Sequence, residues 1–450
     1  MSNETWKTNI AHRTVHLVSL GCTKNLIDSE VMLGRLNGYK IIDEPEEADV
    51  IIVNTCGFIE SAKQESLNTI FDMHERRKEG SVLVMSGCLS ERYKEDLQNS
   101  LDEVDIFTGV GDYDIIDTLV EQKRSQFSNK VFLPDETLDR VVTGSNFHAY
   151  IKLSEGCNQT CAFCAIPNFK GKLQSRTIES IVAEVSNMVT NGYFDFSFVS
   201  QDSSSYMLDF KQKDGIEQLI DAVENIAGVK SARILYLYPS TTSVELINKI
   251  ASSKIFHSYY DMPLQHSTQN MLKIMKRGKG VEKLKELMDA MRDVEDGFVR
   301  STFIVGHPGE TQEDFDELCT YVKDYGFDRA NVFSYSDEED TSAYDRVDKI
   351  PQEVIDSRAE ILGAIIEQTT KQSLEKEVGK TVQVVIEGVS DEHDLLLSAR
   401  KLSWERDIDG EIYINDNEFD LEIKYGHLYN VFISELVGNK LMGKVLSTVK

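Results

Sequence analysis

The chain has 450 residues, of which 41% are hydrophobic and 28% charged, a balance typical of a globular protein with about two or three domains. No apolar run approaches the length of a membrane span, and the first residues lack the basic and apolar regions of a signal peptide. We therefore expect a cytoplasmic protein with no membrane partner. The formal net charge of −28 repels nucleic-acid phosphates and attracts basic partners. Seven cysteines in a reducing compartment favour metal binding or catalysis over disulfides.

Residues 14–125 are predicted to form a first domain, in which apolar strands alternate with amphipathic helices. Strands are predicted at residues 14–20, 50–54, 82–85 and 105–108, and helices at residues 24–36 and 58–78. Continuous apolar strands that alternate with helices indicate an α/β fold with a parallel sheet covered on both faces. We expect a flavodoxin-like or Rossmann-like domain.

Three cysteines of this domain follow three of its predicted strands. Cys22, Cys56 and Cys88 each stand beside a glycine, which lets the backbone approach a bulky group closely. The carboxyl ends of parallel strands line the ligand crevice of an open sheet, so the three thiols are expected to meet there as a shared metal site. The alternative for each is a small buried core thiol.

A second domain is predicted over residues 143–372, after a polar linker at 121–146. Strands are expected at residues 149–153, 194–199, 232–237, 259–262, 299–305 and 329–333, and helices at 177–191, 215–227, 243–252, 281–294, 312–325 and 351–372. Six strand–helix units predict a partial (β/α)6 barrel with its active site at the carboxyl ends of the strands.

The loop after the first of these strands carries Cys157, Cys161 and Cys164, spaced C-x3-C-x2-C. Three thiolates can hold three irons of a [4Fe–4S] cubane, whose fourth iron then stays open to another ligand. A zinc site is the alternative, but zinc prefers a fourth Cys or His nearby, and none follows before His257. The spacing therefore favours the cluster.

Several segments resemble the methylthiotransferases of the radical S-adenosylmethionine (radical SAM) superfamily. The carriers of the resemblance are VSLGCTKN at 18–25, VNTCGF at 53–58, GCL at 87–89, EGCNQTCAFCAIP at 155–167 and KGKLQSR at 170–176. The resemblance implies two [4Fe–4S] clusters. Cys157, Cys161 and Cys164 would hold the SAM-cleaving cluster, and Cys22, Cys56 and Cys88 the auxiliary cluster that serves in sulfur insertion.

The same resemblance implies a SAM site at the strand ends. The stretch after the second barrel strand holds the amino group of SAM in radical SAM folds, and here it contains Ser200, Gln201 and Asp202. Gln265 and Gly306, at later strand ends, complete the expected SAM contacts. We assign no catalytic acid or base beyond the cluster ligands.

Three further residues receive structural interpretations. His266 and His307 are expected to be structural or substrate-adjacent and not metal ligands. Cys319 lies within the predicted helix 312–325 and is expected to be a packed core thiol.

The last domain, residues 375–445, is predicted to be a small all-β barrel of the OB-like kind. Short strands are expected at residues 382–386, 395–397, 411–414, 428–433 and 440–445. Its position resembles that of the TRAM domain, which binds RNA in tRNA-modifying relatives. Residues 373–450 carry fifteen Asp and Glu against nine Lys and Arg, which suits a basic protein partner better than RNA.

The segments DMPLQH at 261–266 and YSDEE at 335–339 resemble the RimO branch of the family in particular. That resemblance implies methylthiolation of the β-carbon of an aspartate in small-ribosomal-subunit protein twelve, as free protein or within the subunit. One SAM would supply the methyl group and a second the radical, with an electron donor and a sulfur source as further partners. Two alternatives stay open: a tRNA adenosine methylthiotransferase of the MiaB type, and a non-enzymatic iron–sulfur protein that binds ribosomes.

Overall fold

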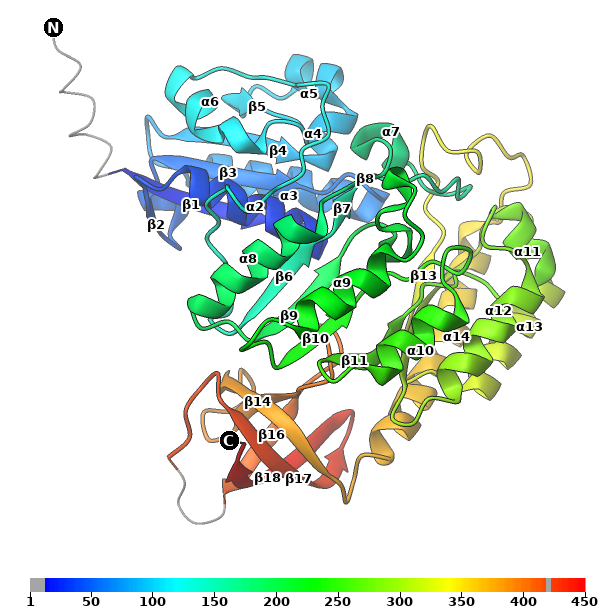
Figure 1. Ribbon diagram of the computed structural model, residues 1–450. Coiled ribbons are helices and arrows are strands. Elements are labelled where there is room, and N and C mark those ends of the chain that lie inside the picture. Colours follow the sequence, from blue (N-terminus) through cyan, green and yellow to red (C-terminus); the bar gives the residue numbers. More distant parts are fainter. Residues whose placement is uncertain (1–12, 418–421, 450) are drawn as a thin grey trace, which may run out of the picture.

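The computed structural model describes residues 13–417 and 422–449, which form three packed parts (Figure 1). A parallel α/β domain comes first, a six-stranded partial barrel follows, and a small closed β-barrel ends the chain. In these described ranges no helix combines the length and apolar character that a bilayer span requires. The predicted fold class is confirmed.

The first sheet has five parallel strands in the order β2-β1-β3-β4-β5. The strands are β1 (Thr14–Ser19), β2 (Lys40–Ile41), β3 (Val50–Thr55), β4 (Val82–Gly87) and β5 (Ile106–Phe107). The helices are α2 (Thr23–Arg35), α3 (Glu60–Arg76), α4 (Cys88–Arg92), α5 (Lys94–Ser100) and α6 (Ile116–Gln122). The strand order is flavodoxin-like and reverses direction between β1 and β3, so the ligand crevice is expected at their carboxyl ends.

The second sheet has six strands in the order β13-β12-β11-β10-β9-β6. The strands are β6 (His148–Lys152), β9 (Asp195–Val199), β10 (Ser231–Ile234), β11 (Phe256–Asp261), β12 (Phe298–Val305) and β13 (Arg329–Ser334). The covering helices are α8 (Ile178–Thr190), α9 (Gly215–Glu224), α10 (Val244–Ser252), α11 (Gln269–Ile274), α12 (Val281–Arg292), α13 (Gln312–Tyr325) and α14 (Gln352–Glu375). A short hairpin of β7 (Ser154–Glu155) and β8 (Gln174–Ser175) flanks α7 (Ile166–Lys170).

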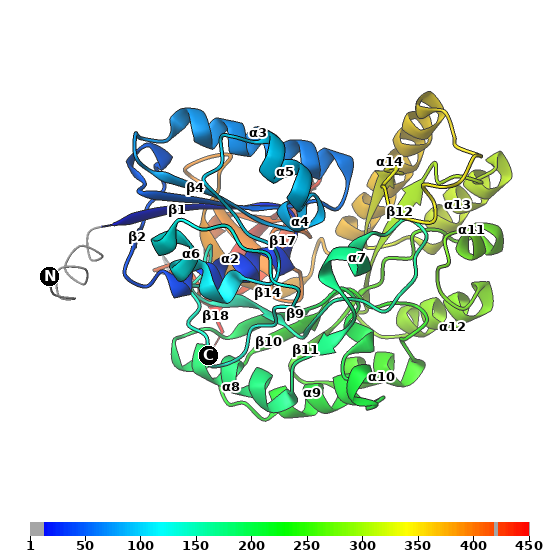
Figure 2. The same cartoon turned by 90° about the horizontal axis from the view of Figure 1, so that it is seen from above.

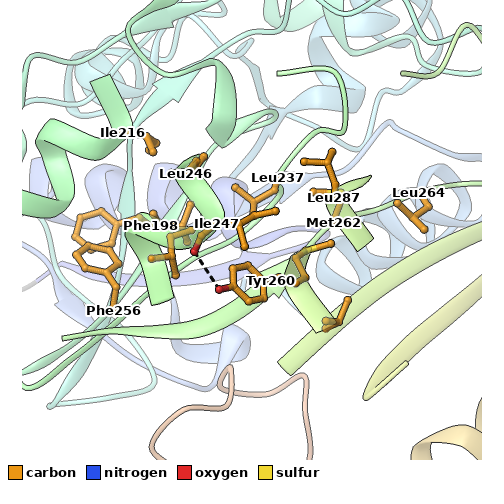
Figure 3. Packing of buried hydrophobic residues seen from close by; sticks show 14 of the residues in the cluster. Phe198, Ile216, Leu237, Leu246, Ile247, Phe256, Tyr260, Met262, Leu264 and Leu287 are labelled. Atoms are coloured by element: carbon orange, nitrogen blue, oxygen red, sulfur yellow. Dashed lines mark hydrogen bonds between the residues drawn. The ribbon is translucent and has the colours of Figure 1, made fainter. Parts of the chain in front are cut away.

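The barrel core lies between these strands and helices. Figure 3 shows Phe198 and Phe256 in contact, with Tyr260 donating its hydroxyl hydrogen to the Ile247 carbonyl at 3.1 Å. A buried tyrosine needs such a partner, because an unpaired hydroxyl in an apolar core is costly. The predicted strand 232–237 ends at Ile234, and Tyr236 then adopts a φ of 61° that no regular strand accommodates.

The last part is a closed barrel with the order β14-β15-β16-β18-β17. Its strands are β14 (Thr381–Val389), β15 (Leu397–Lys401), β16 (Ile412–Asn417), β17 (Leu428–Val437) and β18 (Lys440–Thr448). The fourth and fifth of the strands expected there correspond to β17 and β18, which extend to Val437 and Thr448 and so run past the expected ends at 433 and 445.

The end of β15 and the loop that leads to β16 cover the amino end of the six-stranded sheet. Asp195 opens β9 and accepts hydrogen bonds from Arg233 at 2.7 Å and from Arg400 at 2.6 Å. Glu405 accepts a hydrogen bond from the Ser197 hydroxyl at 2.6 Å. All five side chains are buried, so the two parts share one charged and hydrogen-bonded interior layer.

Helix α2 of the first domain closes the other, carboxyl end. Ile27 packs among Tyr150, Leu235 and Tyr259 of the barrel strands. Asp28, one residue further, pairs with Lys152 at the end of β6. The first domain therefore lies directly over the mouth of the barrel, as the two views in Figures 1 and 2 show.

A second contact joins the same two parts. Glu338, in the loop after β13, is 2% exposed and pairs with Arg92 of α4 at 2.7 Å and with Lys63 of α3 at 3.1 Å. The Ser336 hydroxyl accepts a hydrogen bond from the Glu60 amide at 3.2 Å. This loop therefore fixes the first domain to the barrel from the side opposite α2.

Candidate cluster and cofactor site

The first thiol triad stands at the crevice that the strand order predicts. Cys22 caps α2 directly after β1, Cys56 follows β3, and Cys88 is the first residue of α4 after β4. An amide–amide bridge ties two of these strand ends together. Asn25 donates to the Leu20 and Asn54 carbonyls at 2.8 and 3.1 Å, and Asn54 donates back to the Asn25 carbonyl at 2.9 Å.

Glycines let the three cysteine segments touch. A Cβ at Gly21 would lie 2.7 Å from the Cys56 Cβ and 2.8 Å from its Sγ. A Cβ at Gly57 would lie 2.7 Å from the Leu89 Cα, directly beside Cys88. Contacts under 3.0 Å do not occur for real side chains, so only glycine permits this spacing at both positions. The structure therefore brings Cys22, Cys56 and Cys88 to one rim.

Two thiols of this rim have a raised pKa. Desolvation raises the pKa of Cys56 and of Cys88, and the neighbouring thiols raise both further. The Lys170 ammonium opposes these effects at both cysteines. A bound metal would reverse this balance, because a coordinating thiol is deprotonated outright.

The second triad lies in the loop that leads from β7 into α7. Gly156 has a φ of 78°, and a Cβ there would lie 2.3 Å from the Lys172 carbonyl oxygen, so the loop folds tightly on itself. Desolvation raises the pKa of Cys157 to about 11 and that of Cys164 to about 12. The Cys161 Sγ lies 3.4 Å from the Arg277 guanidinium and 3.5 Å from the Tyr238 hydroxyl.

The two triads face each other across the junction of the two domains. Helix α4, which starts at Cys88, packs against α7, which follows Cys164 (Figures 1 and 2). Lys170 at the end of α7 lies 3.4 Å from Asp28 and 3.6 Å from Glu155. Burial opposes the charge on Glu155, but Lys152 and Lys170 outweigh it and hold its pKa at about 2. A buried ionic network thus connects the triads.

The expected SAM contacts occupy the same carboxyl end of the barrel. The Gln201 side-chain amide donates to Glu155, while its Oε1 is buried and has no partner among the described residues. The side-chain Oε1 of Gln265 is likewise buried without a described partner, at a residue with a φ of 72°. Such orphaned acceptors are costly unless a ligand or water satisfies them.

The other three expected contacts have partners within the protein. Asp202 caps a short helical turn and accepts hydrogen bonds from Gln159 at 2.8 Å and from neighbouring hydroxyls. Ser200 donates to the Ser203 hydroxyl at 3.2 Å. A Cβ at Gly306 would lie 2.4 Å from Ile355 of α14, so this glycine serves close packing.

The two histidines are fully buried. His266 Nδ1 accepts from the Ser267 and Thr268 amides, so its Nε2 carries the proton that points to Glu310 at 3.2 Å. His307 donates from Nδ1 to the Pro308 carbonyl, and desolvation lowers its pKa to about 4. Its Nε2 is therefore a bare acceptor, with no partner in the described ranges. His266, by contrast, has partners at both ring nitrogens and supports the loop after β11 structurally.

Cys319 is half-buried and packs against the barrel core, away from both triads. The sequence reasoning missed three other side chains at the junction: Lys24, Lys170 and Arg277. Each is a buried cation beside a thiol triad. Lys24 and Lys170 belong to segments that carry the family resemblance, whereas Arg277 follows α11. Nothing local in the sequence marks them as buried.

The residues present fit the clusters that the resemblance implies. All seven cysteines are free thiols. Within residues 13–417 and 422–449, no three His, Cys, Asp or Glu side chains stand close enough to share one metal ion. A cubane cluster takes each thiolate on a separate iron, so its ligands stand farther apart than those of a single ion. Among the described residues each triad lacks the fourth Cys or His that a structural zinc site takes, so the triads suit clusters better than zinc.

Comparisons with known proteins agree across the whole chain. Family models match for the uncharacterized protein family UPF0004 at residues 14–109, the radical SAM superfamily at 151–322 and the TRAM domain at 378–446. The chain is 64% identical over 443 residues to the ribosomal protein uS12 methylthiotransferase RimO of Aliarcobacter butzleri, covering 98% of this chain and 99% of the relative. This chain belongs to the RimO methylthiotransferase family.

A second relative with the same name, from Campylobacter jejuni, is 53% identical over 435 residues, covering 97% of this chain and 99% of that protein. Membership in the RimO family confirms the predicted enzyme class, a radical SAM methylthiotransferase, and its cofactors, SAM and [4Fe–4S] clusters. Among solved structures, the radical SAM methyltransferase TsrM of Kitasatospora setae superposes with a TM-score of 0.54 at 13% identity, covering 72% of each chain. At that identity the likeness shows the fold alone.

Proposed function

We propose that this RimO-family enzyme transfers a methylthio group to the β-carbon of an aspartate in ribosomal protein uS12, the protein named in its relatives. The observation that carries the proposal is the meeting of two all-thiol triads at one domain junction. One triad alone serves radical formation, whereas a sulfur transfer needs a second site beside it. The predicted units 14–125, 143–372 and 375–445 would supply sulfur insertion, radical chemistry and partner binding respectively.

In this proposal Cys157, Cys161 and Cys164 hold the SAM-cleaving cluster, and Cys22, Cys56 and Cys88 hold the auxiliary cluster. When bound, these groups supply the hydrogen abstraction and the sulfur chemistry that polar side chains cannot perform on an unactivated C–H bond. The protein's own residues position them and exclude water.

Polar groups at the strand ends have separate tasks. The unpartnered side-chain amide oxygens of Gln201 and Gln265 can accept hydrogen bonds from the amino or hydroxyl groups of SAM. Asp202 and Ser200 instead hold the loop in shape, because their hydrogen-bonding groups are already engaged. Gly306 lets α14 pack closely over the strand end. We therefore assign direct SAM contact to the two glutamines and a supporting role to the other three residues.

Charge favours a basic protein substrate over tRNA. In the last domain, Arg400 is buried and forms ion pairs with Asp195 and Glu387. Lys401 pairs with Glu377 at 2.6 Å, and Lys440 pairs with Glu411 at 3.2 Å. RNA binding depends on cations free to neutralise phosphates, and these cations are occupied within the protein.

The first test separates the two chemistries. Cys22→Ala removes one ligand of the first triad and leaves the second triad intact. Reduced Cys22→Ala enzyme should still cleave SAM to deoxyadenosine while methylthiolated uS12 falls to near zero. Normal product formation by this variant would refute the assignment of the first triad to sulfur insertion.

The second test identifies the substrate by competition. Reduced enzyme receives SAM, a sulfide source, purified small subunits, free uS12 and unmodified tRNA together, with a chemical reductant in place of the physiological electron donor. Mass spectrometry then follows all three acceptors. A single methylthio group on an aspartate of uS12 supports the proposal, and its yield on free protein against subunit identifies the preferred form. A methylthio group on tRNA adenosine, with uS12 untouched, would contradict it.

A further inference from the structure

Lys24 lies between the two thiol triads. It belongs to the first turn of α2, two residues after Cys22, and its side chain reaches across the domain junction to the carboxyl end of the barrel. Its Nζ stands 3.7 Å from the centre of the Tyr236 ring. Two residues beyond, the Tyr238 hydroxyl lies 3.5 Å from Cys161. The Lys24 ammonium therefore lies close to the space that both triads border.

Lys24 differs from Lys152, Lys170 and Arg300 in that its ammonium has no direct carboxylate partner among the described residues. Lys152 and Lys170 form a closed network with Asp28 and Glu155, two cations against two anions. Arg300 pairs with Asp261 at 3.5 Å, one against one. Lys24 is 9% exposed, and its ammonium makes no direct hydrogen bond or ion pair with any residue in 13–417 or 422–449; the Glu155 and Asp261 carboxylates act on it only from longer range.

A buried ammonium without an anion is costly, and contact with an aromatic face offsets that cost only in part. The hydroxyl of neighbouring Thr23 is also buried without a partner in the described part of the chain. The start of α2 thus holds two donors, one of them charged, that no acceptor in the described residues satisfies directly. A carboxylate has the matching charge and two acceptor oxygens.

Two carboxylates can come to this junction, that of SAM and that of the aspartate whose β-carbon is modified. Lys24 stands two residues from Cys22 of the first triad, whereas the expected SAM subsite adjoins Cys157–Cys164 and includes Gln201, which binds Glu155. Position therefore favours the aspartate. This reasoning rests on the proposed function.

We infer that Lys24 is the specificity-determining cation that binds the side-chain carboxylate of the substrate aspartate. Fixing that carboxylate holds the adjacent β-carbon between the two triads, where hydrogen loss and sulfur transfer must both occur. Lys24 also selects aspartate over asparagine, because a neutral amide leaves the ammonium unpaired.

The test measures binding without turnover. Mass spectrometry first identifies the aspartate of uS12 that the wild-type enzyme modifies, and uS12 is then made with that residue changed to asparagine. Fluorescence anisotropy gives the Kd of each labelled uS12 form for unreduced, reconstituted wild-type and Lys24→Met enzymes. Lys40→Met is the matched control, because Lys40 is an exposed lysine of β2 and its replacement makes the same charge change. Equilibrium dialysis gives the Kd of SAM.

Loss of a charged hydrogen-bonded pair should weaken binding of aspartyl uS12 by Lys24→Met about ten- to hundredfold. The asparaginyl form should bind wild-type and Lys24→Met enzymes about equally, Lys40→Met should match wild type, and the Kd of SAM should not change. Equal weakening of both uS12 forms would overturn the inference and make Lys24 a support for the cluster. A rise only in the Kd of SAM would also overturn it. Failure of wild-type enzyme to bind or modify uS12 would overturn the proposed function, and this inference with it.

Discussion

Replacing Gly21 by alanine tests the packing of the first triad. Gly21 has a φ of 83°, and an alanine Cβ would meet the Cys56 Cβ at 2.7 Å and its Sγ at 2.8 Å. Gly80 provides the control, because its φ is 82° and nothing lies within 4 Å of its added Cβ. The left-handed backbone costs an alanine about 1–2 kcal/mol at either site. The contact with Cys56 adds about 1–3 kcal/mol of overpacking at Gly21 only.

That additional cost should displace Cys56 from the rim. Wild-type protein, reconstituted anaerobically, should hold about eight irons in two [4Fe–4S] clusters. Gly80→Ala should keep this iron and lose stability only by the backbone cost. Gly21→Ala should retain about half of the iron, while deoxyadenosine formation from SAM persists. Full iron content and normal methylthiolation in Gly21→Ala would refute the reasoning that the two loops must touch for the triad to form.

Three further predictions concern other parts of the chain. Asp195→Asn should destabilise the protein by about 3–5 kcal/mol, because Arg233 and Arg400 lose their shared anion. Burial opposes the charge on Asp195, but the two arginines outweigh it and depress the pKa of Asp195. The ionised carboxylate therefore stabilises the fold fully above about pH 4, and this stabilisation fades as the pH falls further. The difference in unfolding free energy between wild type and Asp195→Asn should narrow when unfolding is followed from about pH 7 to about pH 3. Glu338→Ala should lower the thermal midpoint and speed proteolysis in the loop after β13, because the loop loses its ion pairs to Arg92 and Lys63. An unchanged proteolysis rate would show that Glu338 does not hold the loop to the first domain. Cys319→Ala should keep full iron and full activity by iron assay and mass spectrometry, and a loss of half the iron would contradict its core assignment.

Local patterns were sufficient to predict the three folds and the two sets of cysteines. The strands that precede Cys22, Cys56 and Cys88 are short apolar runs bounded by turn residues, and parallel strands bring their ends together by topology alone. The tight spacing of Cys157–Cys164 needs no tertiary information. These signals depend on neighbouring residues, which the sequence displays directly.

The contacts between the parts could not be predicted in this way. Ile27 has the spacing of a residue that packs on its own sheet, yet it enters the barrel. Lys24 and Asp28 read as solvent-facing charges of an amphipathic helix, and burial of Asp28 depends on Lys152, 124 positions away. Pairing over such distances leaves no periodicity in either segment. The strand expected through residue 237 stopped at Ile234 for the same reason, since the junction imposes the left-handed turn at Tyr236.

The last domain is a separate barrel, but its segment from Arg400 to Glu405 also covers the amino end of the catalytic barrel. The last domain of this chain therefore cannot be replaced by just any small barrel. A graft that lacks counterparts of Arg400 and Glu405 would leave Asp195 and Arg233 facing water, and it would fail whatever partner its outer surface prefers. A new partner can be accommodated by changing the outward side chains of the last domain, whereas Arg400 and Glu405 must keep their contacts with the six-stranded sheet.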